Sequence, residues 1–199
     1  MNASLTDVDW SALPPPPDDG AVRHLFGARL PPLALPATNG RDIHLGTLSG
    51  RGVVYLFPSM TGRPDLPSAD WNLIPGARGC TPQSCAFRDH FAELRRLGVD
   101  FLFGLSTQLT AEQREAAERL HLPFPILSDA DLSLARALKL PTFEAAGRSF
   151  LKRMTFILQG SLIEHVIYPI FPPDRNADDV IAWLRAHAAG RPVALDASR

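Results

Sequence analysis

The sequence contains two cysteines, Cys80 and Cys85, in the stretch Gly79-Cys-Thr-Pro-Gln-Ser-Cys85. A cysteine thiolate can act as a nucleophile, bind a metal or form a disulfide. Pro82 is typical of the first turn of a helix, where its missing N–H removes no hydrogen bond. Cys80 is therefore predicted to lie at or just before the N-terminus of a helix. Free backbone N–H groups and the helix dipole stabilise an anion there, which favours the reactive thiolate.

The spacing of the two cysteines has a mechanical consequence. Residues five positions apart in an intact helix have Cα atoms about 8.7 Å apart, from the standard rise and radius. A disulfide requires Cα atoms about 4.4–6.8 Å apart. Cys80 and Cys85 therefore cannot bond unless the first turn of the helix unwinds.

Two other roles are possible for cysteines in this pattern. Free cysteine is among the most buried residue types, and on spacing alone packing and chemistry both stay open. His90 follows Cys85 by five residues, which suggests a zinc site. A structural zinc site needs four ligands, however, and the sequence has no second Cys/His pair at metal spacing. We therefore expect no metal.

The composition is that of a soluble globular domain. The chain has 199 residues, of which 45% are hydrophobic and 21% charged, and its formal net charge is −1. This balance gives no argument for a nucleic acid or an anionic membrane as partner. The N-terminus lacks the pattern of a signal peptide, and no apolar run is long enough to span a membrane. A cytoplasmic protein is expected, where a transient catalytic disulfide is more common than a stable one.

The elements that must position the cysteines follow from periodicity and turn residues. Residues 1–25 are expected to form a poorly packed proline-rich arm, 26–190 the domain and 191–199 a tail. Strands are predicted at 53–57, 99–106, 124–127, 153–158 and 162–168, with a hairpin turn at Asn39-Gly40. Helices are predicted from Thr81 to a stop at Gly98, from a capping box of Thr110 and Gln113 to residue 121, after Asp129 or Asp131, and at 178–189. Residues 58–79 read as a long loop.

This order predicts an α/β fold with a central mixed sheet flanked by helices. A redox cysteine at the start of the first long helix fits a thioredoxin-like arrangement.

The chain resembles the peroxiredoxins, and within them the bacterioferritin-comigratory or Q-type branch. The resemblance covers about residues 27–188, and its most specific part is the paired-cysteine segment 79–89. Supporting segments are residues 27–40, 99–106, 126–129, 153–158 and 163–166.

The resemblance implies the following roles. Cys80 is the peroxidatic cysteine, which attacks a hydroperoxide and becomes a sulfenic acid. Cys85 is the resolving cysteine, which forms an intramolecular disulfide that thioredoxin or a similar thiol reductant reduces. Arg153 matches an arginine that stabilises the thiolate and orients the peroxide oxygens. No metal or organic cofactor is required, and the protein is expected to be a monomer or a homodimer.

The segment before Cys80 departs from the family pattern. By direct counting, Leu73 and Ala77 stand where the family has a proline and a threonine. Upstream, Phe57-Pro-Ser-Met-Thr61 resembles the start of the same motif, which predicts an insertion at about 62–78. Pro58 and Thr61 are then the expected site residues, with Thr61 folded back to reach Cys80. Gln83 stands where many relatives have glutamate.

Three functions follow. The main one is a thiol peroxidase that reduces hydrogen peroxide or organic hydroperoxides. A thiol–disulfide oxidoreductase is disfavoured, because those enzymes usually carry two intervening residues rather than four. A redox sensor or partner-binding module that uses the same cysteine switch is the alternative from a different class.

Overall fold

The computed structural model describes residues 8–60, 71 and 73–187. Its centre is a five-stranded sheet with strand order β5-β4-β3-β8-β9. Strand β3 pairs in parallel with β4 and antiparallel with β8, so the sheet is mixed, as expected. The strands of this sheet are β3 (Arg51–Leu56), β4 (Phe101–Ser106), β5 (Ile126–Ser128), β8 (Met154–Gln159) and β9 (Leu162–Ile167).

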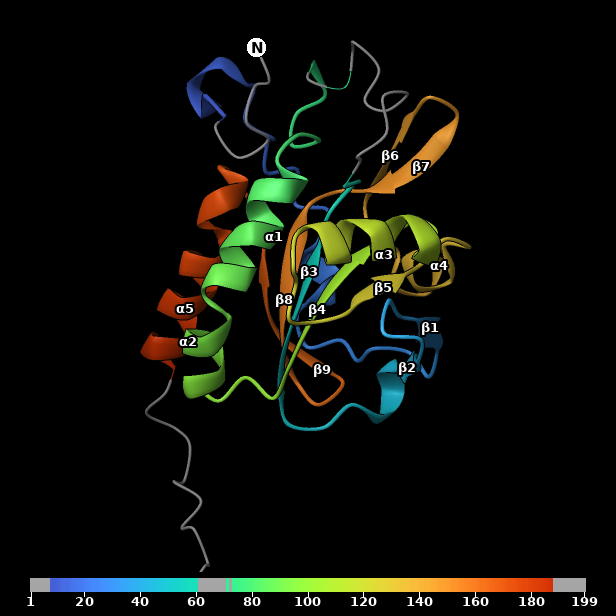
Figure 1. The fold of residues 1–199 in the computed structure, drawn as a ribbon, viewed down its shortest axis with the longest axis vertical. Helices are drawn as coiled ribbons and strands as arrows, with labels where there is room; N and C mark the ends of the chain where they lie inside the picture. Colours follow the sequence, from blue (N-terminus) through green and yellow to red (C-terminus); the bar gives the residue numbers. More distant parts are fainter. Residues whose placement is uncertain (1–7, 61–70, 72, 188–199) are drawn as a thin grey trace, which may run out of the picture.

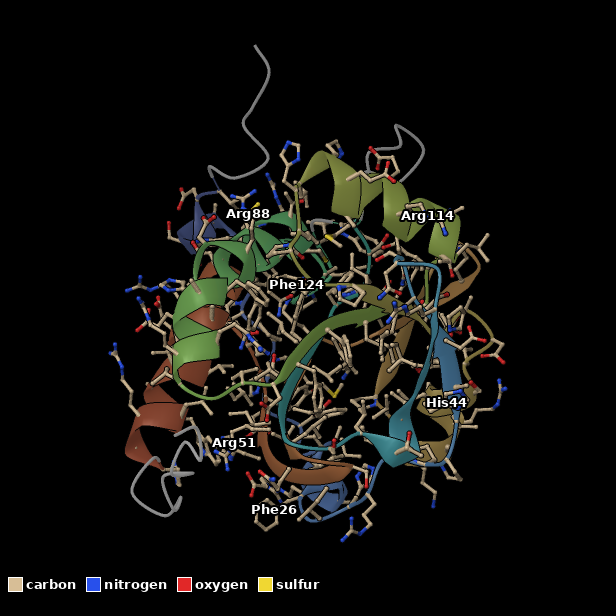
Figure 2. The ribbon with its side chains drawn as sticks, turned by 60° about the horizontal axis from the view of Figure 1, so that its bottom comes forward. Phe26, His44, Arg51, Arg88, Arg114 and Phe124 are labelled. Atoms are coloured by element: carbon tan, nitrogen blue, oxygen red, sulfur yellow. The ribbon has the colours of Figure 1, made fainter. Side chains whose placement is uncertain are left out.

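Alternate residues of the central strands supply two separate cores. Val53 and Tyr55 face one side of the sheet and Val54 and Leu56 face the other, and all four are buried. The first side is covered by α1 (Cys80–Asp89), α2 (Phe91–Arg96), α3 (Thr110–Arg119) and α5 (Asn176–Ala186). In Figure 2, Phe124 of this core lies near the centre of the molecule, whereas Arg88 and Arg114 lie at its periphery.

Shorter elements cover the second side of the sheet. They are α4 (Ser133–Leu138), the hairpin of β1 (Ala34–Pro36) and β2 (Asp42–His44), and the 3-10 turns η2 (Arg23–Leu25) and η3 (Leu45–Thr47). The predicted turn at Asn39-Gly40 joins β1 to β2, which confirms that hairpin. A second hairpin, β6 (Thr142–Ala145) with β7 (Arg148–Leu151), has no counterpart in the sequence predictions and stands apart from the sheet in Figure 1. Within the described residues, no helix has both the length and the apolar character needed to cross a bilayer.

Two predictions about helices were wrong in detail. The helix predicted from Thr81 to Gly98 is interrupted at His90, where φ is −93° and ψ is 4°, and continues as α2. At the start of α3, Glu112 rather than Gln113 accepts a hydrogen bond from the backbone of Leu109 at 3.1 Å. Gln113 points into the core instead, because its amide donates to Ser106 Oγ at 3.0 Å and to the Leu127 carbonyl at 2.8 Å. Asp129 does accept hydrogen bonds from the first backbone N–H groups of α4, as predicted.

The described part of the N-terminal arm is mostly solvent-exposed, but a few of its residues contact the domain. Leu25 is fully buried in the second core, and Trp10, in the turn η1 (Trp10–Ala12), donates a hydrogen bond to Asp174 in η5 (Pro173–Arg175) at 2.9 Å. Asp19 accepts hydrogen bonds from Lys152 at 2.7 Å and from the Tyr168 hydroxyl at 2.8 Å. Most side chains of the arm are solvent-exposed, yet these contacts hold it against the domain near the start of α1 (Figure 1).

Candidate functional site

Cys80 is the first residue of α1, as the sequence predicts. Gly79 precedes it with φ at 101°, a conformation that only glycine adopts readily. A Cβ atom at Gly79 would lie 2.7 Å from Cγ of Pro173 and 2.8 Å from Cη2 of Trp10. The close approach of η5 and of the N-terminal arm therefore fixes a glycine here, and both segments pack directly beside the start of the helix.

Arg153 contacts the Cys80 sulfur directly. Its Nη2 donates a hydrogen bond to Sγ of Cys80 at 3.2 Å, and the exposed fractions of the two side chains are 3% and 4%. Arg153 immediately precedes β8, the strand that pairs with β3. As a thiol, Cys80 donates to the carbonyl of Ala77 at 3.6 Å; as a thiolate, it accepts from Arg153. The structure thus brings two of the predicted site residues together.

The guanidinium of Arg153 is held by the segment that leads into α1. Its Nη2 donates to the carbonyls of Gly76 at 3.2 Å and Arg78 at 3.1 Å, and its Nη1 donates to Oε1 of Gln83. Its buried Nε has no partner among the described residues. A planar guanidinium held at both terminal nitrogens keeps Nη2 beside the Cys80 sulfur with little further loss of side-chain entropy.

A buried polar chain extends from Gln83, and sequence analysis missed it. Nε2 of Gln83 donates to Oδ1 of Asn176 at 2.9 Å, and the hydroxyl of Thr155 donates to the same oxygen at 2.7 Å. All three side chains are fully buried. A glutamine can donate to Asn176 and accept from Arg153 at once, whereas an ionised glutamate could only accept. Glutamine at position 83 can therefore satisfy both neighbours, the Arg153 donor and the Asn176 acceptor.

Cys85 lies in the same helix as Cys80, and neither forms a disulfide. The helix is continuous from Cys80 to Asp89, so the ideal separation of about 8.7 Å applies to the two Cα atoms. Burial raises the pKa of the Cys85 thiol, and the nearby Arg88 partly opposes that rise. Cys85 is therefore held as a protonated thiol at neutral pH.

Pro58 and Thr61 belong to the segment that follows β3. Pro58 is buried two residues beyond the end of the strand, while Thr61 lies outside the described residues. Between them, the backbone N–H of Met60 donates to Oε1 of Gln108 at 2.8 Å. Ser84 of α1 donates to Sδ of Met60 at 3.1 Å, so the residue before Thr61 contacts the cysteine helix.

In the loop before α1, Trp71 and Ala77 are packed against the domain, whereas Leu73 and Pro75 are solvent-exposed. Trp71 is 5% exposed and contacts the β6–β7 hairpin, with ring centroids 5.0 Å from Phe150 and 5.9 Å from Phe143. Ala77 is fully buried in the same cluster. This cluster fixes the backbone carbonyls that Arg153 contacts.

The arrangement can stabilise negative charge at one point. A sulfur atom at a helix N-terminus, 3.2 Å from a fixed guanidinium nitrogen, is favoured as an anion. The same nitrogens can stabilise charge that develops on an oxygen bonded to that sulfur. A second thiol one and a half turns away can react with the first only after the helix changes.

Comparison with known proteins identifies the family. The Redoxin family model matches residues 26–181. Peroxiredoxin Bcp of Escherichia coli strain K12 is 30% identical over 163 residues, which are 79% of this chain and 94% of that protein. The chain belongs to the peroxiredoxins. Among solved structures, peroxidoxin BcpB of Mycobacterium tuberculosis is 27% identical with a TM-score of 0.65, covering 81% of this chain and 96% of its own.

The branch follows from the likeness to these two proteins, and a more distant structural neighbour shares the fold. The bacterioferritin comigratory protein of Xanthomonas campestris is 22% identical with a TM-score of 0.61, covering 89% of this chain and 98% of its own. The chain is thus a peroxiredoxin of the Bcp/Q branch with a thioredoxin-like fold, as the sequence predicts. The family match begins at residue 26, so the N-terminal arm that contacts Gly79 lies outside it.

Proposed function

We propose that this peroxiredoxin reduces hydroperoxides with Cys80 as the attacking thiolate and Cys85 as its disulfide partner. The observation that carries the proposal is the hydrogen bond of 3.2 Å from Arg153 to the Cys80 sulfur at the N-terminus of α1. In support, a solved structure of the Xanthomonas campestris protein is described by its alkyl peroxide reduction activity.

The first step forms a bond between Sγ of Cys80 and the terminal oxygen of the hydroperoxide. The O–O bond breaks, and the departing alkoxide or hydroxide takes a proton to become an alcohol or water. The sulfur, oxidised by two electrons, remains as a sulfenic acid. The fixed guanidinium of Arg153 stabilises the thiolate and the charge that develops on the oxygens. Pro58 and Thr61 complete this site in the proposal, with the Thr61 hydroxyl donating to the peroxide or the thiolate.

The second step forms the disulfide. The Cys85 thiol attacks Sγ of Cys80, the S–O bond breaks, and water leaves with the Cys85 proton. The start of α1 must unwind for this step, because about 8.7 Å between Cα atoms exceeds disulfide reach. A thioredoxin-type dithiol then donates two electrons and two protons to restore both thiols.

Stopped-flow oxidation followed by coupled turnover tests the proposal. Cys80→Ser is expected to abolish peroxide consumption. Cys85→Ser is expected to form a sulfenic acid at Cys80, detectable by mass spectrometry with a dimedone tag, but to lose recycling by thioredoxin. A peptide map of the peroxide-treated chain should contain a Cys80–Cys85 disulfide without intermolecular species. Undiminished turnover of Cys85→Ser would contradict the resolving role.

The same assay separates a peroxidase from a redox sensor. A peroxidase consumes stoichiometric peroxide within seconds and turns over with reductant, whereas a sensor oxidises without efficient turnover. Thr61→Ala tests the threonine in the same way, with Thr61→Ser as the conservative control. If Thr61→Ala kept the full rate while Cys80→Ser lost it, Thr61 would not be part of the site.

A further inference from the structure

The N-terminal arm forms one wall of a cavity beside Arg153. The cavity has a volume of about 270 Å³. Its lining comes from the arm, from the segment before α1, from the β6–β7 hairpin, and from residues next to β8 and β9. The main apolar contributors are Pro16, Pro17, Ile74, Pro75, Phe143 and Pro169.

Arg153 is a side chain that the cavity and the Cys80 site share. Arg153 lines the cavity, and its Nη2 lies 3.2 Å from Sγ of Cys80. Gly76 also lines it, and the Gly76 carbonyl accepts a hydrogen bond from the same Nη2 at 3.2 Å. A molecule whose peroxide group is held at Arg153 therefore has this cavity as space for its remaining atoms.

The size and the chemistry of the cavity both indicate an apolar organic group. A volume of about 270 Å³ is several times the roughly 30 Å³ that one water molecule occupies, so the two oxygens of hydrogen peroxide would leave most of it unfilled. It lies just below the usual range for ligand pockets, about 300–1,000 Å³. The lining also includes two cations, Arg153 and Lys152, of which Lys152 is paired with Asp19. Apolar walls beside the Arg153 guanidinium suit a compact hydrocarbon group attached to a polar head.

The arm is anchored to the domain both before and after Pro16 and Pro17, the arm residues that line the cavity. At one end, Trp10 donates to Asp174 at 2.9 Å and packs edge-on against Phe171. At the other end, Asp19 accepts from Lys152 at 2.7 Å and from Tyr168 at 2.8 Å. Between the anchors, residues 14–17 are four consecutive prolines, whose fixed φ angles make the span stiff. The wall is therefore preorganised, which lowers the entropic cost of binding.

We propose that the arm residues Pro16 and Pro17, held by Asp19, form a binding site for the organic group of a hydroperoxide with a compact apolar substituent. The arm thus determines the preference for such hydroperoxides over hydrogen peroxide. This proposal rests on the peroxidase function proposed above, yet the arm itself precedes the part of the chain that the family model matches. Trp10 and Asp19 position the wall, and Pro16 and Pro17 contact the substrate.

The experiment compares hydrogen peroxide, tert-butyl hydroperoxide and cumene hydroperoxide in stopped-flow oxidation of the full chain. Asp19→Ala releases one anchor, and Pro16→Ser combined with Pro17→Ser makes the wall polar. Glu115→Ala is the matched control, because Glu115 is also an exposed carboxylate paired with a cation, Arg119 at 2.9 Å, but on α3. Titration of cumyl alcohol, the product of cumene hydroperoxide reduction, measures binding without the reaction.

Exposing one methylene group to water weakens binding about fourfold. Both arm variants are expected to lower the rate constant for cumene hydroperoxide about fivefold to tenfold. The hydrogen peroxide rate should change less than about twofold, because little of that molecule contacts the wall. The dissociation constant of cumyl alcohol should rise in parallel with the cumene effect, and Glu115→Ala should match the unmodified chain in every assay.

An equal loss for all three hydroperoxides, or no change for any, would overturn the proposal. So would a cumyl alcohol affinity that neither arm variant alters. If the unmodified chain reduced no hydroperoxide, the peroxidase function would fail instead, and the alcohol titration would still decide whether the arm forms a binding site.

Discussion

Nη2 of Arg153 lies 3.2 Å from Sγ of Cys80, although the two residues are 73 positions apart in the sequence. Arg153 immediately precedes β8, which pairs with β3 in the sheet. The helix α1, which begins with Cys80, packs over the side of the sheet that Val53 and Tyr55 of β3 face, and this packing allows the contact. The guanidinium also donates to carbonyls of the segment that precedes Cys80. One side chain therefore holds both the cysteine sulfur and the backbone that leads to it.

Substitution of Arg153 should separate charge from geometry. Arg153→Met removes the cation and its hydrogen bonds, and we expect the rate of peroxide reaction to fall about 100-fold, as when an oxyanion donor is removed. Arg153→Lys keeps the charge but loses the fork, and its rate should lie between those of Met and Arg. Stopped-flow measurements give both values. Arg175→Met, at an exposed arginine paired with Asp178, is the control that should keep the full rate.

A Met variant with the wild-type rate would remove Arg153 from the mechanism. Urea unfolding of each variant, under reducing conditions, distinguishes a catalytic loss from a loss of the folded state.

The chain of Gln83, Asn176 and Thr155 should determine how firmly Arg153 is held. Gln83→Met has similar volume but breaks the hydrogen bonds to Arg153 and Asn176. Each buried group left without a partner costs about 1–3 kcal/mol. Nη1 of Arg153 loses its acceptor, while Oδ1 of Asn176 keeps the Thr155 hydroxyl. The free energy of unfolding should therefore fall by about 1–3 kcal/mol, and the peroxide rate should fall with it because the guanidinium loses an anchor.

Gln159→Met, at the exposed end of β8, is the matched control for that substitution. It removes the same functional group from the surface and should change the unfolding free energy by less than about 0.5 kcal/mol. Equal unfolding curves for Gln83→Met and the unmodified protein would show that the hydrogen bonds of Gln83 do not stabilise the site.

Local signals in the sequence account for the parts of the fold that were predicted. Pro82 and the loop before it place the helix start at Cys80, and Asn39-Gly40 places a hairpin turn, because such residues act on the backbone within a few positions. Apolar runs located the central strands for the same reason. The break at His90 lies within a helical pattern that continues on both sides of it, so periodicity did not reveal it.

Contacts between distant segments were predictable only in part. Arg153 could be proposed through the family resemblance, since nothing in its local sequence distinguishes it from a surface arginine. Asn176 had no such signal, because a polar residue at a helix start is ordinary, and its contact with Gln83 depends on how α5 packs against α1. The packing of the arm was missed because its few anchors, Trp10 and Asp19, lie among exposed residues.

The stability of the reduced protein should depend on pH through Cys85. Burial raises the pKa of its thiol above the ordinary 9.0 in the folded state. Below 9.0 the thiol is protonated whether the chain is folded or unfolded, and its contribution to stability is fully present. As the pH rises through this value, the unfolded chain loses the proton while the folded chain keeps it, so stability falls.

Urea unfolding with reductant at about pH 7.5 and about pH 10 measures this effect. Cys85→Ser should lose less stability over that interval than the unmodified chain. Tyr55 and Tyr168, whose pKa values are also raised by burial, are present in both proteins and cancel in the comparison. Identical pH slopes for the two proteins would mean that the Cys85 thiol does not contribute.

Hydrogen exchange should reveal unwinding of α1 when the disulfide forms. In the reduced chain, the amide of Gln83 donates to the Gly79 carbonyl at 3.0 Å, and the helix continues to Asp89. Joining Cys80 to Cys85 must bring their Cα atoms from about 8.7 Å to within about 6.8 Å, which the intact turn does not allow. Gln83 and Ser84 lie between the cysteines, so their hydrogen bonds to Arg153, Asn176 and Met60 should break as well.

We therefore expect amides 83–89 to exchange at least about tenfold faster after one equivalent of peroxide, while amides of α5 (Asn176–Ala186) stay protected. Cys85→Ser is the control, because its Cys80 oxidises without a disulfide and should keep the protection of α1. Unchanged exchange at 83–89 in a chain whose disulfide is confirmed by mass spectrometry would mean that the two sulfurs meet without unwinding. Helix geometry excludes that result, because an intact α1 keeps the two Cα atoms about 8.7 Å apart even if the whole helix moves relative to the sheet.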